Sequence, residues 1–319
     1  MRRVLAALLC ALFLAGCTWR PELPPEPTPV PTTAPTPAPT PSPTPPPTPE
    51  PTPTPEPDVP VALLGSTYSS LSTALSLTEL TDEVLPELAA QLGSFPHLER
   101  LELDGKLTDA LVYETLCLPN PGLQVVWTAH IGEVAWRTDE IKFCQNVHGL
   151  DPRCSDERLM EQLRYYPRMR ALDFGHCHDV ISEALWLRYT PELEILILAD
   201  CRLTDLTPVG ELTKLTYLEL HDNYTLEDIA PLANLTELRD LNLSMTKVSD
   251  LSPLYACSKL ERLWLNCCDN ITEEEIAAFQ AVVPGCEVKR ERALATQSGW
   301  REHDRYFWMR DFFDAHYMT

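Results

Sequence analysis

Four copies of one leucine pattern lie between residues 193 and 265: LEILIL (193–198), LTYLEL (215–220), LRDLNL (238–243) and LERLWL (260–265). Successive copies are 22, 23 and 22 residues apart. A fixed period in the twenties indicates a stack of repeats, each too small to bury its own apolar edge. In each copy the last two leucines alternate with another residue, which predicts a short strand with one buried side.

The pattern continues outward from these copies with less regularity. Clean frames occur at 98–103 (LERLEL) and 169–174 (MRALDF), and weaker ones at 75–77, 123–126, 141–143 and 283–288. Residues 127–139 fit no frame, and Gly132 predicts the turn of a short inserted hairpin. Stacked strands of this kind form a parallel sheet, so we expect one continuous sheet surface along the stack.

These repeats resemble the leucine-rich repeat family, from about residue 72 to 288. The resemblance implies an α/β solenoid: a curved stack with a parallel sheet on the concave face and short helices or 3-10 turns on the convex face. It also implies that the position three residues after the last leucine points inward. That position holds Cys177, Cys201, Asn223, Thr246 and Cys268, and Lys106 departs from the pattern.

The segments that return from one strand to the next differ along the chain. Proline recurs in three of them, at Pro208, Pro231 and Pro253, which predicts extended chain or a tight turn. These short returns resemble those of the internalin-like bacterial surface proteins. Residues 82–92 and 156–165 have helical character, and Thr272 precedes a helix with the spacing of a capping box.

The N-terminus predicts export and lipid attachment. Arg2 and Arg3 precede a short apolar run, and Leu14-Ala15-Gly16-Cys17 resembles a bacterial lipoprotein signal. We expect residues 1–16 to be removed and Cys17 to carry a lipid such as palmitate, on the extracytoplasmic side of the cell membrane; the alternative is an ordinary signal peptide. Residues 17–60 are rich in proline and threonine, which predicts a disordered stalk.

Charge and cysteine content narrow the function further. Without residues 1–16 the chain has 23 basic and 47 acidic residues, a net charge of about −24, which disfavours nucleic acid as a partner. Nine cysteines remain beyond Cys17, an odd number, and we expect Cys177 and Cys201 to be buried thiols rather than a disulfide.

The sequence carries no pattern that indicates catalysis or a cofactor. It has no phosphate-binding glycine loop, no nucleophile elbow and no zinc-protease motif. His176, Cys177 and His178 invite a zinc interpretation, but strand alternation separates their side chains. A column of His176, Asp200 and Asp222 is expected to be solvated rather than metal-bound. We therefore predict neither an enzyme nor a metal site.

The concave face is the better candidate for function. The resemblance implies that the unpatterned strand positions point outward there, with aromatic rings displayed among carboxylates, as in protein interfaces. The ligand-binding candidates on this face are Tyr217, Glu219, His221, Asp222, Trp264, Asp173 and Arg262. The alternative is that an adjacent segment covers Ile195 and Ile197 and that Trp264 is part of a cap.

The end of the chain is rich in aromatic residues between Trp300 and Tyr317. Met309, Phe313 and Tyr317 share one helical face. We expect residues 293–319 to cap the last coil of a repeat domain that spans residues 61–292, with an interaction helix as the alternative. The sequence thus predicts a lipid-anchored protein that binds a protein or an envelope glycan without catalysis. The alternative is a structural component that spaces or assembles envelope proteins.

Overall fold

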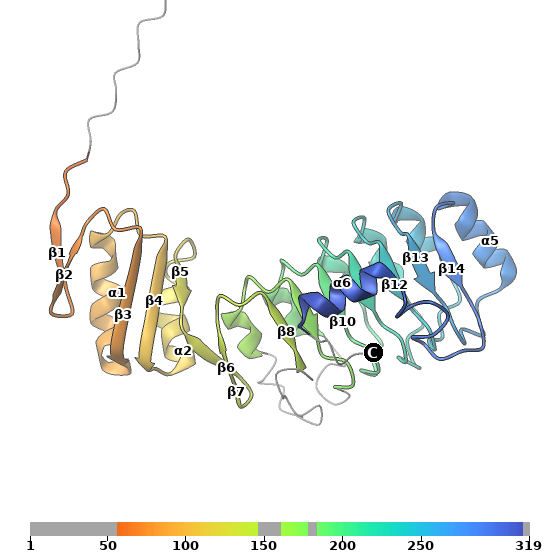
Figure 1. The fold of residues 1–319 in the computed structure, drawn as a ribbon, viewed down its shortest axis with the longest axis horizontal. Helices are drawn as coiled ribbons and strands as arrows, with labels where there is room; N and C mark the ends of the chain where they lie inside the picture. Colours follow the sequence, from red (N-terminus) through yellow and green to blue (C-terminus); the bar gives the residue numbers. More distant parts are fainter. Residues whose placement is uncertain (1–55, 146–160, 178–183, 315–319) are drawn as a thin grey trace, which may run out of the picture. The chain divides into compact units, whose positions relative to one another are not determined.

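The computed structural model describes residues 56–145, 161–177 and 184–314. Within these residues the repeats form a seven-stranded sheet whose strands follow one another in chain order (Figure 1). Every pairing in this sheet is parallel. The strands are β8 (Lys142–Cys144), β9 (Ala171–Asp173), β10 (Ile195–Ile197), β11 (Tyr217–Glu219), β12 (Asp240–Asn242), β13 (Arg262–Trp264) and β14 (Glu287–Lys289).

The register of the sheet follows the leucine pattern. Leu196 of β10 pairs with Leu218 of β11, and Leu218 pairs with Leu241 of β12. Leu241 in turn pairs with Leu263 of β13. All four side chains are buried in the main apolar core, together with the leucines of the returns. The prediction of a repeat stack with parallel strands is therefore confirmed, and the fold class is an α/β solenoid.

The returns also agree with the sequence. The proline-containing returns form 3-10 turns, as fixed proline backbone angles favour. The threonine of the predicted capping box, Thr272, accepts a hydrogen bond from the Glu275 amide, and α5 (Glu273–Val282) follows. The 3-10 turns along this sheet are η4 (Gln162–Tyr165), η5 (Leu185–Tyr189), η6 (Val209–Glu211), η7 (Ala230–Asn234) and η8 (Ser252–Ala256). Residues 156–160 of the other predicted helical return lie outside the described residues.

The N-terminal coils form a separate sheet, so the expectation of one continuous sheet is wrong. β3 (Ala74–Thr81), β4 (Arg100–Lys106) and β5 (Gln124–Val126) form a parallel sheet of their own. The break coincides with the predicted hairpin, β6 (Thr128–Ile131) and β7 (Val134–Arg137), whose turn contains Gly132 at φ +62°. The hairpin pairs antiparallel and supplies no strand that would join β5 to β8.

The remaining elements complete the N-terminal part. A hairpin of two strands precedes β3, and helical turns follow β3 and β4 (Figure 1). Their bounds are β1 (Pro60–Leu63), β2 (Ser66–Ser69), η1 (Asp82–Val84), α1 (Leu85–Gln91), η2 (Leu92–Ser94), α2 (Asp109–Val112) and the π-helical turn η3 (Tyr113–Cys117). The helical return predicted at residues 82–92 is confirmed. Among the described residues, no helix is both long and apolar enough for a membrane span.

A second apolar cluster lies on the other face of the seven-stranded sheet. It joins Ile195, Tyr217 and Trp264 to Trp300 and to α6 (Asp304–Phe312), which crosses the strands in Figure 1. The residues from Trp300 to Phe313 therefore pack across the face of the sheet, which differs from the end cap predicted for this part of the chain. Alternation along each strand explains the two clusters, because leucines point to one face and their neighbours to the other.

Candidate functional site

We call the face of the seven-stranded sheet opposite the 3-10 turns the open face, and residues 293–314 the C-terminal segment. The open face consists of the first and third residues of each strand, together with the polar residues that follow. The segment covers it: Tyr217 and Trp264 are each only 1% exposed. The expectation that these rings and Ile195 are displayed to solvent is therefore wrong, and the alternative of an adjacent covering segment is confirmed for Ile195 and Ile197.

Trp300 is the central contact between the C-terminal segment and the sheet. It is completely buried, and its indole Nε1 donates a hydrogen bond to Glu219 Oε1 over 3.0 Å. Its ring lies 5.3 Å from that of Trp264 and 5.7 Å from that of Tyr217, between ring centroids. Tyr217 also donates a hydrogen bond to Glu219. Three aromatic rings and one carboxylate thus form a single packed unit.

A cluster of charges adjoins Trp300. The Arg262 guanidinium lies 4.3 Å from the centroid of the Trp300 ring, in cation–π geometry, and its Nε donates to Asp240 Oδ1 over 2.5 Å. Arg305 of α6 lies 3.3 Å from the other oxygen of Asp240 and 2.7 Å from Glu261. Burial raises the pKa of Asp240, although the charges of Arg262 and Arg305 oppose this effect.

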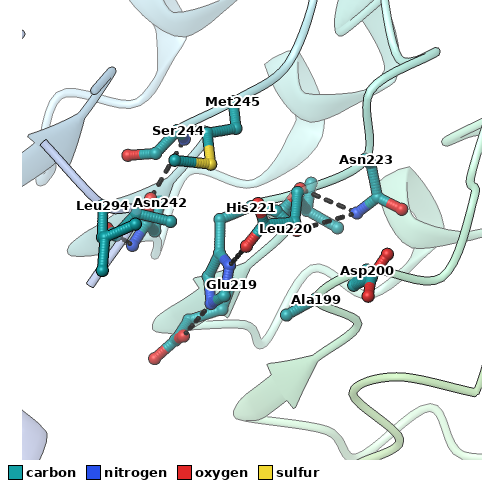
Figure 2. Close-up of polar contacts among 12 residues, drawn as sticks. Ala199, Asp200, Glu219, Leu220, His221, Asn223, Asn242, Ser244, Met245 and Leu294 are labelled. Carbon is teal, nitrogen blue, oxygen red and sulfur yellow. Dashed lines mark hydrogen bonds and ion pairs between the residues drawn. The ribbon is translucent and has the colours of Figure 1, made fainter. Parts of the chain in front are cut away.

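His221 connects two carboxylates at the edge of this unit. Its Nε2 lies 3.0 Å from Glu219 Oε2 (Figure 2). Its Nδ1 lies 2.8 Å from Asp222 Oδ2. Because both ring nitrogens face acceptors, the ring is best satisfied when both carry protons. Burial opposes the charged form, but the hydrogen bonds and charges of Asp222 and Glu219 raise the pKa of His221 to about 9. Burial likewise opposes ionisation of Glu219, yet its hydrogen bonds hold its pKa below the usual value.

This arrangement predicts a pH dependence of stability. The pKa of His221 is about 9 in the folded chain, against an ordinary value of 6.5. The stabilisation that protonated His221 gives to the folded chain is complete below pH 6.5. It is lost as the pH rises towards 9, because His221 then loses its proton in the folded chain as well. The expected loss is on the order of 3 kcal/mol. Urea unfolding between pH 6 and 9.5 measures it, and a parallel decline in His221→Gln would contradict the assignment.

The remaining candidate, Asp173, lies on β9, towards the other end of the open face. Asp173 accepts hydrogen bonds from the Gly175 amide and from Cys144 Sγ, and its burial raises its pKa. Together with Glu219, His221 and Arg301 it lines a cavity of about 70 Å³ beneath α6. The space is enough for water but not for an organic ligand.

The column of histidine and aspartates forms ordinary polar contacts. His176 Nδ1 lies 3.2 Å from Asp200 Oδ2, and the Asp222 carboxylate accepts from Tyr224 as well as from His221. The part of the chain that the structure describes contains no group of three potential metal-ligating side chains at metal-binding spacing.

The inward repeat position has a structural role. Asn223 accepts hydrogen bonds from the amides of Cys201 and Leu203, and its Nδ2 donates to the carbonyl of Leu198. Nδ2 also donates to the carbonyl of Leu220 (Figure 2). Cys201 is a buried thiol whose Sγ donates to backbone carbonyls, so it forms no disulfide with Cys177. The expectation of thiols at this pair is confirmed.

The structure brings all seven candidates together on one face, but sequence reasoning missed what covers them. The covering side chains are Trp300, Arg305, Tyr306, Met309 and Phe313. The aromatic character of Trp300, Tyr306 and Phe313 was visible in the sequence, whereas the surface that they cover was not. The closest prediction was the alternative in which an adjacent segment covers Ile195 and Ile197.

A comparison with known protein families agrees with the repeat pattern of the sheet. Residues 191–234 match the family model described as Leucine Rich repeats (2 copies). No curated protein matches the chain. The chain therefore contains leucine-rich repeats and folds as a leucine-rich repeat solenoid.

Several solved structures are similar to the chain at low sequence identity. An internalin C2 of Listeria monocytogenes is 19% identical, with 72% of this chain and 87% of that chain covered and a TM-score of 0.39. A leucine-rich repeat protein of Leptospira interrogans is 16% identical, covering 67% and 52%, with a TM-score of 0.36. The yeast Rad7 and Elc1 complex contains a chain 15% identical, covering 71% and 72%, with a TM-score of 0.38.

Proposed function

We propose that this chain is a lipid-anchored, extracytoplasmic protein that binds another protein through the open face, without catalysis. The observation that carries the proposal is that the open face already holds a polypeptide: the C-terminal segment buries Trp300, Tyr306, Met309 and Phe313 against it. A surface that accommodates large rings and matches their polar atoms has the chemistry of a protein interface.

The seven candidate residues have the roles expected in such an interface. Tyr217 and Trp264 provide aromatic contact area, and Arg262 provides a flat guanidinium for stacking. Asp173, Glu219, His221 and Asp222 supply the polar contacts. Leucine-rich repeats stack such positions from distant parts of the chain into one surface, which suits the recognition of a macromolecule.

The anchor rests on the sequence, because residues 1–55 lie outside the described residues. Cys17 follows the signal-like run, and the proline-rich residues 17–60 would hold the repeat domain away from the membrane surface. Metabolic labelling with palmitate tests this part. Wild type is expected to incorporate label and Cys17→Ser to lose it. Equal labelling of the two chains would contradict attachment at Cys17.

Site-specific photo-crosslinking tests the binding surface. A crosslinker at Asp222, at the accessible edge of the open face, is expected to yield a protein adduct on intact cells. The matched control places the crosslinker at Glu211, which is exposed on the opposite face in η6. Adducts of equal yield at both positions would reject the open face as the binding surface, and an adduct containing carbohydrate alone would identify an envelope glycan instead.

A further inference from the structure

We propose that residues 299–314 act as an internal ligand of the open face, which a partner protein displaces. Their contacts with the face indicate the chemistry of that partner. The partner that replaces them is an arginine-bearing helical segment of another protein, with an aromatic ring where Trp300 lies and a guanidinium where Arg305 lies. This inference rests on the proposed function, because it names the class of partner that the open face binds.

The first argument is the polarity of the open face beneath the C-terminal segment. Asp173, Glu219 and Asp240 are each less than 5% exposed, beneath a segment that also buries Trp300, Tyr306, Met309 and Phe313. Removing a carboxylate from water costs free energy unless hydrogen bonds and opposite charges offset it. A face that evolved as permanent core would carry apolar residues at these positions, as the leucine face does. The open face instead has the composition of an interface.

The second argument is an unmet hydrogen-bond donor. Arg262 is 2% exposed, and its Nη2 has no hydrogen-bond partner in the described part of the chain. Nη1 donates to the Trp300 carbonyl over 3.2 Å and Nε to Asp240. The C-terminal segment therefore leaves a buried donor unsatisfied. A partner with a carbonyl or carboxylate near Nη2 gains a contact that the internal segment lacks.

The third argument is charge complementarity. The segment presents Arg305 to Asp240 and Glu261, and Arg301 to the cavity that Asp173 and Glu219 line. These two arginines of the segment thus face carboxylates of the sheet, whereas its Asp314 pairs with Lys142 of β8. The buried carboxylates of the open face therefore favour a partner that carries arginine at these two positions.

The fourth argument is that the helix of the segment is short and buries only one of its sides. A turn at Ser298 and Gly299, both at positive φ (61° and 94°), precedes Trp300. α6 is only nine residues long and is marginal as an isolated helix. Its outer side leaves Trp308 46% and Phe307 38% exposed. On the side of α6 that faces the sheet, Tyr306 and Met309 are buried, and so is Phe313, the residue that follows the helix.

Peptide binding to the full chain tests the proposal. The probe is a fluorescent synthetic peptide of residues 299–314, followed by anisotropy. Wild type is expected to bind it weakly, because its own tethered segment competes. Phe313→Ala loosens the segment without changing the sheet and is expected to bind the peptide at least about tenfold more tightly. Trp308→Ala, on the outer side of the same helix, is the matched control and is expected to behave as wild type.

Peptide variants test the stated chemistry. Trp300→Ala or Arg305→Glu within the peptide is expected to weaken binding to the Phe313→Ala chain at least about tenfold. A scrambled peptide of the same composition is expected not to bind. A measurement without a chain variant completes the test: saturating peptide should accelerate hydrogen exchange of the α6 amides in the wild-type chain.

Three results would overturn the proposal. One is equal peptide affinity for wild type and Phe313→Ala together with unchanged hydrogen exchange in α6. Another is equal binding of the scrambled or Arg305→Glu peptide. The third is a dimer of the Phe313→Ala chain in light scattering, held by exchanged segments, which would make a second copy the occupant. Tight peptide binding without any protein crosslinked at Asp222 in cells would instead reject the proposed function alone.

Discussion

Replacing Asn223 with alanine is expected to lower the free energy of unfolding by about 4 kcal/mol, because several buried backbone groups lose their partner at once. The side chain is fully buried and accepts from the amides of Cys201 and Leu203 over 3.1 and 3.0 Å. It donates to the carbonyls of Leu198 and Leu220 over 2.9 and 2.7 Å. These groups lie where the strand ends, in fully buried residues, so the loss of the amide leaves them without a protein partner.

The matched control for Asn223 is the same position in the next coil. Thr246 is also buried, but its Oγ1 donates one hydrogen bond to a backbone carbonyl, that of Leu243, over 2.7 Å. Thr246→Ala is expected to cost only about 1 kcal/mol. Urea unfolding followed by circular dichroism measures both variants. Losses of equal size would show that the position, not the asparagine hydrogen bonds, determines stability.

The sequence predicted those features of the fold that local patterns determine. Leucine spacing gave the strands and their register, because a repeated unit can bury its apolar side only against its neighbours. Gly132 marked the turn of the β6–β7 hairpin, and Thr272 marked the start of α5, because turn and cap chemistry act within a few residues. The break between the two sheets was missed, since an inserted hairpin does not reveal whether the strands on either side still pair.

The candidate site was predicted less completely. The strand positions of Tyr217 and Trp264 followed from alternation, but their burial did not. It depends on contacts such as that of Trp300 with Glu219, 81 residues apart in the chain. The aromatic residues after residue 299 define an apolar helix side without indicating which surface meets it. Contacts between such distant residues are decided by tertiary packing, and local sequence periodicity gives no information about them.

Asp240→Ala is expected to lower the free energy of unfolding by about 4 kcal/mol, because it leaves the buried Arg262 without its carboxylate. The two side chains are 1% and 2% exposed, and Nε lies 2.5 Å from Oδ1. The matched control is Glu237→Ala in the neighbouring exposed pair, where Glu237 lies 2.6 Å from Lys259 and both are about half exposed. That variant is expected to lose no more than about 0.5 kcal/mol, because water solvates the remaining lysine.

A double replacement separates the cost of an unpaired charge from the value of the pair. Asp240→Leu with Arg262→Met removes both charges and keeps apolar volume beneath Trp300, so at least half of the loss in Asp240→Ala should be recovered. Urea unfolding of the three variants measures this. If the double variant is as unstable as Asp240→Ala, the pair itself stabilises the fold. If the double variant is at least as stable as wild type, the charged pair contributes no stability to the fold, and its place on the open face is better explained by binding than by folding.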